Sequence, residues 1–139
     1  MKNKVSIAFV CTHNSCRSQM SEAVAKLDHS DFFKPYSAGT HLKKRINPDA
    51  VSLIKKEYGF DMEETQFNKT LDHLPKSLDV LVTMGCGVEC PYIPTKHRED
   101  WDLDDPTGKD ISEFHKTLSL IQKKMQTLRN CIESGEVEI

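Results

Sequence analysis

The sequence predicts an α/β protein, with a small doubly wound four-stranded parallel sheet flanked by helices. The apolar run at residues 5–10 and the largely apolar segment 78–84 are typical of strands that are buried on both faces. Amphipathic helical patterns alternate with the strand-like runs. The resulting order is strand, helix, strand, helix, strand, strand and helix, which favours a doubly wound sheet. With 139 residues, the chain is expected to form a single domain over residues 1–139.

Each element has a local signal. Four segments are expected to form strands: residues 5–10, 32–40, 78–84 and the shorter 96–103. A first helix is predicted over residues 19–27, where apolar side chains recur with the spacing of one helical face. The second helix follows Asn47, an expected N-cap, with Pro48 in the first helical position and Gly59 as its stop. A long amphipathic helix is predicted from Asp110 onward.

Composition narrows the class of function. The chain is 37% hydrophobic and 29% charged, with a formal net charge of −2, so it lacks the basic excess typical of nucleic-acid binders. Its apolar runs are too short for a membrane span, and its first residues lead into a strand instead of a signal-peptide core. We therefore expect a cytoplasmic monomer that binds neither nucleic acid nor membrane.

Cysteines are the most informative residues. There are five of them: Cys11, Cys16, Cys86, Cys90 and Cys131. In a reducing compartment they are expected to be thiols, unless they are catalytic, redox-active or metal-bound. Cys11 and Cys86 each follow a predicted strand, and ligands of doubly wound sheets bind beyond the carboxyl ends of the strands. Cys131, on the last helix, is expected to be a structural or surface thiol.

The loop from Cys11 to Ser18 joins a strand to a helix. Its backbone N–H groups and the positive end of the helix can converge on a tetrahedral oxyanion. Arg17 adds a planar fork that binds two of the oxygens. The same field stabilises a Cys11 thiolate, to which Ser18 can donate, so Cys11 is the expected nucleophile. The predicted oxyanion-binding positions are Thr12, His13, Asn14, Ser15, Cys16 and Arg17. A buried structural role for Cys11 is the alternative, and the strand–loop–helix context disfavours it.

These motifs resemble a known family. "FVCTHNSCRSQMSEA" is similar to the signature of the low-molecular-weight protein tyrosine phosphatases. More narrowly, "CTHNSCRSQM", "YSAGT", "DVLVTMGCGVECP" and "EDWDLDDPTGK" resemble the phosphatase-like, thioredoxin-coupled arsenate reductases, in the family's order over most of the chain. The resemblance implies that Cys11 is the nucleophile, that residues 12–17 cradle the anion, that Arg17 clamps it, and that Asn14 and Ser18 brace the loop. For Cys16, a loop-shaping role and an oxidation-prone thiol both stay open.

The resemblance also implies the substrate and the partner. The substrate would be arsenate or a similar phosphate-like oxyanion, and thioredoxin or a related thiol reductant would recycle the enzyme. No cofactor and no metal are expected. Expulsion of an oxygen leaving group needs a proton, and "LDDPTG" offers Asp104 and Asp105. The family's general acid is the aspartate directly before proline, which here is Asp105. Without the Cys11 loop, an ordinary Asp-Pro turn would be the preferred interpretation.

The pair Cys86 and Cys90 separates reduction from hydrolysis. Reduction of arsenic(V) to arsenic(III) takes two electrons, which two thiols supply by forming one disulfide, whereas hydrolysis needs only water. The predicted relay has Cys86 attack the sulfur of Cys11 and Cys90 then attack Cys86. Better-known reductases of the family place more than three residues between the last two cysteines, so a small-thiol reductant stays open beside thioredoxin.

Two other functions compete with the reductase. A protein tyrosine phosphatase would use Cys11, Arg17 and Asp105 to hydrolyse phosphomonoesters through a cysteinyl-phosphate. A zinc-binding or thiol-redox interaction module would instead gather four of the cysteines. Their C-x4-C and C-x3-C spacings fit structural zinc less well than C-x2-C knuckles do, and Arg17 would have no role beside metal-bound thiolates.

Overall fold

The computed structural model describes residues 4–41, 44–85 and 93–139. Within these ranges, four strands form one parallel sheet in the order β2-β1-β3-β4. The strands are β1 (Val5–Cys11), β2 (Phe33–Gly39), β3 (Leu78–Thr83) and β4 (Thr95–Asp100). The helices are α1 (Arg17–Asp28), α2 (Pro48–Tyr58) and α3 (Ile111–Ser134), with short 3-10 helices η1 (Met62–Glu64) and η2 (Leu71–His73). The predicted four-stranded parallel fold is confirmed.

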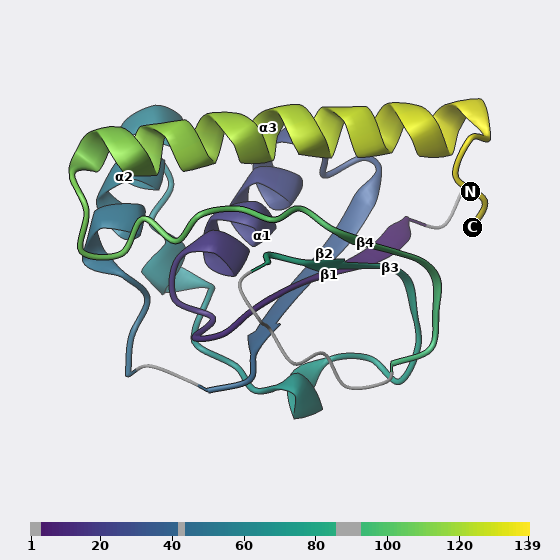
Figure 1. Cartoon of the computed structure of the whole chain (residues 1–139), viewed down its shortest axis with the longest axis horizontal. Coiled ribbons are helices and arrows are strands. Elements are labelled where there is room, and N and C mark those ends of the chain that lie inside the picture. Colours follow the sequence, from purple (N-terminus) through teal and green to yellow (C-terminus); the bar gives the residue numbers. More distant parts are fainter. Residues whose placement is uncertain (1–3, 42–43, 86–92) are drawn as a thin grey trace.

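The two faces of the sheet are covered differently. The helices α1, α2 and α3 contact one another and lie on the same side of the sheet, while η2 lies on the opposite side (Figure 1). The larger core fills the space between the sheet and the three helices, and its fully buried side chains include Phe9, Met20, Ile54, Phe114 and Ile121. A smaller apolar cluster on the other face consists of Ala8, Val10, Leu78 and Leu81.

The second helix begins and ends as its sequence predicts. The side chain of Asn47 accepts a hydrogen bond of 2.8 Å from the backbone N–H of Asp49, and Pro48 follows as the first helical residue. Gly59 ends the helix with φ of 69°, a left-handed conformation that glycine adopts without steric cost. The end of α2 is therefore determined by local chemistry.

The fourth strand is shorter than the predicted 96–103, because it ends at Asp100. Asp102 has φ of 45°, which is incompatible with a continuing strand. The N–H of Leu103 still donates to the carbonyl of Met84 at 3.0 Å, so the chain follows the end of β3 beyond the last strand residue.

The strand register aligns the carboxyl ends of the sheet. Cys11 pairs with Gly39 of β2, Val10 pairs with Thr83 of β3, and Thr83 pairs with Asp100 of β4. The strands β1 and β3 are neighbours although they are not consecutive in sequence. Such a switch point is where open α/β sheets bind their ligands. Cys11 therefore lies where the fold favours a site.

The longest helix, α3, has 24 residues and is amphipathic. The predicted apolar positions Phe114, Leu118, Ile121, Met125 and Leu128 are buried against the core. In the parts of the chain that the structure describes, no helix combines the length and the apolar character needed to cross a membrane.

Arg129 fastens α3 to the turn that follows α1. Its Nη1 and Nη2 lie 3.0 and 2.7 Å from the carboxylate of Asp31, and its guanidinium lies 4.7 Å from the centre of the Phe32 ring. Nη1 also lies 3.1 Å from Nδ1 of His29. Because a guanidinium can only donate, Nδ1 accepts, which requires a neutral imidazole. Burial, and then the charge of Arg129, lower the pKa of His29.

This contact predicts a pH dependence of stability. The unfolded His29 takes up a proton near its ordinary pKa of about 6.5, whereas the folded side chain resists protonation. The native state then binds fewer protons than the unfolded state, so the free energy of unfolding falls as the pH drops through this range. We expect His29→Asn to flatten the dependence, measured by urea unfolding at a series of pH values. Parallel curves for the two proteins between about pH 8 and about pH 5 would contradict the prediction.

Candidate active site

The loop between β1 and α1 encloses the predicted nucleophile. Cys11 is the last residue of β1, and only 3% of its surface is exposed. Asn14 has φ of 50°, a left-handed conformation that asparagine tolerates better than most residues. This residue turns the chain back toward α1, which begins at Arg17. The unpaired N–H groups of the first helical turn therefore lie at the loop.

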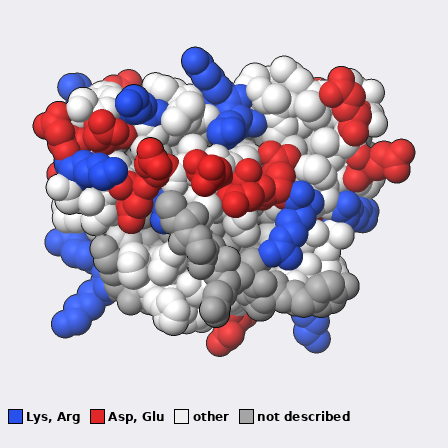
Figure 2. Space-filling view, viewed as in Figure 1, with Lys and Arg blue, Asp and Glu red and all other residues white. Residues whose placement is uncertain are grey.

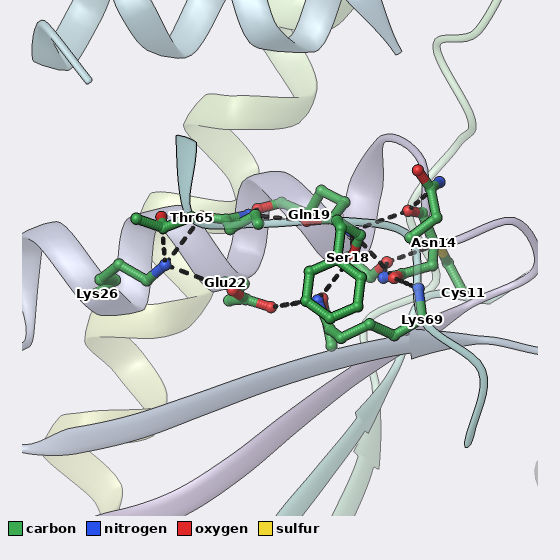
Figure 3. Close-up of polar contacts among 12 residues, drawn as sticks. Cys11, Asn14, Ser18, Gln19, Glu22, Lys26, Thr65 and Lys69 are labelled. Carbon is green, nitrogen blue, oxygen red and sulfur yellow. Dashed lines mark hydrogen bonds and ion pairs between the residues drawn. The ribbon is translucent and has the colours of Figure 1, made fainter. Parts of the chain in front are cut away.

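A hydroxyl contacts the thiol directly. The Oγ of Ser18 lies 2.9 Å from the Sγ of Cys11, and Nδ2 of Asn14 donates to the same Oγ at 2.8 Å (Figure 3). Since Asn14 supplies a donor to the Ser18 oxygen, the hydroxyl proton is left for the sulfur. A hydrogen bond to the charged form of a group stabilises that form, so this arrangement favours the Cys11 thiolate.

The side chain of Arg17 is held by backbone carbonyls that follow β3 and β4. Its guanidinium is 4% exposed, and Nη1 donates to the carbonyls of Met84 and Leu103 at 3.0 and 2.9 Å. Nη2 lies 4.0 Å from Oδ2 of Asp105. Two carbonyls thus fix the plane of the guanidinium, and Arg17 also lines the hollow beside Cys11.

A small hollow brings the chemistry-bearing side chains together. It is lined by Cys11, His13, Ser15, Cys16, Arg17, Asp105 and Thr107. The carboxylate of Asp105 accepts from the N–H of Thr107 at 3.0 Å, and its side chain is 38% exposed. Asp105 therefore combines a fixed orientation with access to solvent, as a residue that delivers a proton to a leaving group requires.

The surroundings of this hollow are acidic. Asp100, Asp102 and Asp104 are exposed in the segment that leads from β4 toward α3. Figure 2 shows acidic side chains in a band across this face, where Figure 1 shows the same segment crossing below α3. Exposed carboxylates repel anions, whereas Arg17 inside the hollow would attract them.

The structure places most of the predicted site residues around this hollow. Four of the predicted oxyanion-binding residues line it: His13, Ser15, Cys16 and Arg17. The side chain of Asn14 lies behind the loop, and the carbonyl of Thr12 accepts from the N–H of His41 at 2.8 Å. Cys86 and Cys90 lie outside the described residues. The chemical roles of all these residues stay predictions.

Other residues shape the site without having been identified from motifs. Gly39 faces the loop so closely that a Cβ would lie 2.7 Å from the N of Asn14 and 2.8 Å from the O of Thr12. Thr107 also lines the hollow, and its position two residues after Asp105 in "LDDPTG" could have indicated this. Gln19 is fully buried and donates to Oδ1 of Asn14 at 3.0 Å, a contact for which the sequence carries no signal.

The close approach of Gly39 gives a testable consequence. Because both crowded atoms belong to the backbone, Gly39→Ala must shift the loop. We expect a loss of about 1–3 kcal/mol in unfolding free energy, as for other overpacked sites. Alkylation of Cys11 by iodoacetamide should slow in the same variant. Gly59→Ala is the control, since its strained φ also costs stability but lies at the end of α2. Equal alkylation rates in the two variants would sink the idea that Gly39 shapes the loop.

Comparisons with known proteins identify the family and agree with the fold. Residues 6–137 match the family model described as low molecular weight phosphotyrosine protein phosphatase. "Arsenate reductase 1" of Staphylococcus epidermidis is 37% identical over 129 residues, which cover 89% of this chain and 95% of that protein. A solved structure described as "An arsenate reductase in the phosphate binding state" has a TM-score of 0.80 and 30% identity, covering 89% of this chain and 95% of the other. The structure of the thioredoxin-dependent arsenate reductase of Corynebacterium glutamicum has a TM-score of 0.76 and 27% identity, and the match covers 96% of this chain and 64% of the other.

Proposed function

The chain belongs to the low molecular weight phosphotyrosine protein phosphatase family, and from this premise we propose that it reduces arsenate to arsenite. One observation carries the proposal. The buried thiol of Cys11 contacts the Ser18 hydroxyl at 2.9 Å and lines a hollow with Arg17 and Asp105. A nucleophilic thiol, a guanidinium and a proton donor are the groups that nucleophilic attack on a tetrahedral oxyanion needs. Relatives that match most of the chain are named arsenate reductases, which supports arsenic as the central atom.

In the first step, the Cys11 thiolate attacks the arsenic atom of arsenate. A bond forms between Sγ and arsenic while one bond from arsenic to a hydroxyl breaks. The leaving hydroxyl takes a proton from Asp105 and departs as water. Arg17 and the loop N–H groups bind the remaining oxygens, on which the negative charge lies. Arsenic is still in its pentavalent state in this adduct.

The second step transfers the electrons. A Cys86 thiolate attacks the sulfur of Cys11, so an S–S bond forms and the S–As bond breaks. The electron pair of the broken bond stays on arsenic, which leaves as arsenite in the trivalent state. Two thiols have then become one disulfide, and the two electrons are accounted for. This step rests on the chemistry of the reaction and on the place of Cys86 directly after Gly85 at the end of β3.

The last steps regenerate Cys11. Cys90 attacks Cys86, which frees the Cys11 thiolate and moves the disulfide to Cys86 and Cys90. Thiol exchange conserves the number of disulfides, so an external dithiol must finally reduce this pair. We propose a thioredoxin in the cytoplasm as this reductant. A solved relative named as thioredoxin-dependent supports the choice, and a low-molecular-weight thiol is the competing reductant.

The lining of the hollow favours a bare oxyanion over a phosphotyrosine. Among the described residues that line it, none is a phenylalanine, tyrosine or tryptophan, and the residue two places after Asp105 is Thr107. A phenolic substrate would gain little from such walls, since aromatic recognition relies on apolar and stacking contacts. Hydrolysis of small phosphomonoesters is therefore the expected side activity, because arsenate and phosphate have the same tetrahedral shape.

A coupled assay tests the reductase proposal. Reduced protein is mixed with arsenate, thioredoxin, thioredoxin reductase and NADPH, and the loss of NADPH absorbance is followed. We expect consumption that depends on both arsenate and the protein, because each turnover returns one disulfide to thioredoxin. A parallel series with glutathione, glutaredoxin, glutathione reductase and NADPH identifies a small-thiol reductant. If neither series shows arsenate-dependent consumption, the protein is not an arsenate reductase.

The relay itself predicts the behaviour of Cys86→Ser. This variant should lose arsenate-dependent NADPH consumption down to the rate without enzyme, since the thiolate that the relay assigns to attack Cys11 is gone. It should keep a weak hydrolysis of p-nitrophenyl phosphate, because the hollow around Cys11 is unchanged. Cys131→Ser is the matched control and should reduce arsenate like the parent, since Cys131 lies on α3, away from the hollow. Arsenate reduction by Cys86→Ser at the parent rate would rule out the relay as drawn.

A further inference from the structure

A row of buried amide side chains lies behind the Cys11 loop (Figure 3). Gln66, which is 4% exposed, follows η1 and lies against α1. Its Nε2 donates to Oε1 of Gln19 at 2.8 Å and to the Gln19 carbonyl at 3.1 Å. Gln19 in turn donates from Nε2 to Oδ1 of Asn14 at 3.0 Å. Asn14 continues through the hydroxyl of Ser18 to Cys11. Each amide in this row therefore donates toward the thiol.

Neighbouring groups that can only donate or only accept a hydrogen bond determine the orientation of each amide. The backbone N–H of Lys69 can only donate, and it reaches Oδ1 of Asn14 at 2.8 Å. The carbonyl of Phe67 can only accept, and it lies 2.9 Å from Nε2 of Gln19. At the outer end, the ammonium of Lys26 can only donate, and it lies 3.4 Å from Oε1 of Gln66. Every amide consequently turns its oxygen away from Cys11 and its nitrogen toward it.

Reversal of one amide would change what Ser18 does. If the Asn14 carboxamide turned over, its oxygen would face the Ser18 hydroxyl and accept that proton. Cys11 would then lose its donor, and the thiolate would lose the stabilisation that the hydrogen bond supplies. The orientation of amides well behind the loop thus bears on the reactivity of the sulfur.

We propose that Gln66 is a positioning residue for the Cys11 thiolate, acting through Gln19 and Asn14. The contact spans 47 residues of sequence, from the segment after η1 to the first turns of α1. Gln66 makes two hydrogen bonds to Gln19, and together with the Phe67 and Asn14 carbonyls it holds the Gln19 amide in the orientation that Asn14 requires. The proposal rests on the proposed role of Cys11 as nucleophile, and it does not depend on arsenate being the substrate.

The charged groups beside the row are already paired with one another. The carboxylate of Glu22 accepts from Ser37 at 2.6 Å and lies 3.5 Å from the ammonium of Lys26 and 3.4 Å from that of Lys69. Burial lowers the pKa of Lys69, and the charge of Glu22 opposes this effect. The row itself carries no charge, so a charge placed at position 66 meets Lys26 as its nearest cation.

The test is Gln66→Glu, which keeps the shape of the side chain but replaces its donor with an acceptor. The new carboxylate gains Lys26 as an ionic partner but faces the Gln19 carbonyl without a donor, so the urea midpoint should fall, and alkylation is measured under conditions where the variant is still folded. The carboxylate repels Oε1 of Gln19, so the Gln19 amide must move or turn, and either change weakens its hydrogen bond to Oδ1 of Asn14 and, through Asn14, the contact with Ser18. We expect alkylation of Cys11 by iodoacetamide to slow about tenfold near pH 7, with the midpoint of its pH profile raised by about one unit. Peptide mass spectrometry with fragment ions separates Cys11 from the other four thiols.

Two further variants complete the experiment. Thr65→Val is the matched control, because Thr65 contacts Lys26 at 3.3 Å beside Gln66 but lies outside the row, and its Cys11 profile should equal that of the parent. If Gln66→Glu does not fold, Gln66→Met takes its place, because methionine has a similar size and no hydrogen-bond donor. We expect this variant to slow the alkylation of Cys11 about threefold. A folded variant at position 66 with the parent profile overturns the proposal. Slower alkylation in a protein that consumes no NADPH with arsenate would uphold it while refuting the reductase function.

Discussion

The carboxamide of Asn14 is the group on which the geometry of the site depends. It accepts from the Lys69 backbone behind the loop and donates to Ser18 in front of it, while its own backbone is left-handed. One buried side chain thus satisfies partners on both sides. A change in the shape of the loop would leave these groups unsatisfied, at about 1–3 kcal/mol for each. The thiol of Cys11 is consequently presented by a rigid frame, which is what a preorganised oxyanion site requires.

The parallel sheet supplies the second part of that frame. Arg17 belongs to the first helix, yet the carbonyls that fix its guanidinium come from Met84 at the end of β3 and Leu103 beyond β4. These segments meet only because the register brings the carboxyl ends of neighbouring strands to one edge. The proposed anion-binding loop is therefore local in sequence, whereas the orientation of Arg17 depends on neighbouring strands of the sheet.

The features that could be predicted from the sequence are those determined by nearby residues. The apolar strands, the cap at Asn47 and the position of Cys11 at the end of β1 all follow from local patterns, and the structure confirms them. The early end of β4 could not be predicted, because it follows from the left-handed backbone of Asp102. The amide contact of Gln66 with Gln19 was equally hidden, since it joins segments 47 residues apart. No hydrophobic period or short motif encodes a hydrogen bond of that kind.

The choice between reduction and hydrolysis depends on the element that Cys11 attacks as much as on the protein. In the proposed mechanism the hollow binds arsenate and phosphate by the same shape and charge, so both would form an adduct with the sulfur. A thiolate that attacks this sulfur must expel the attached atom together with an electron pair. Arsenic accepts that pair and leaves as arsenite, whereas phosphorus has no comparably accessible trivalent oxyanion under the same conditions. The phosphate adduct can therefore proceed only by attack of water on phosphorus. In this proposal, additional thiols make the site a reductase for arsenate, and they leave its phosphate chemistry hydrolytic.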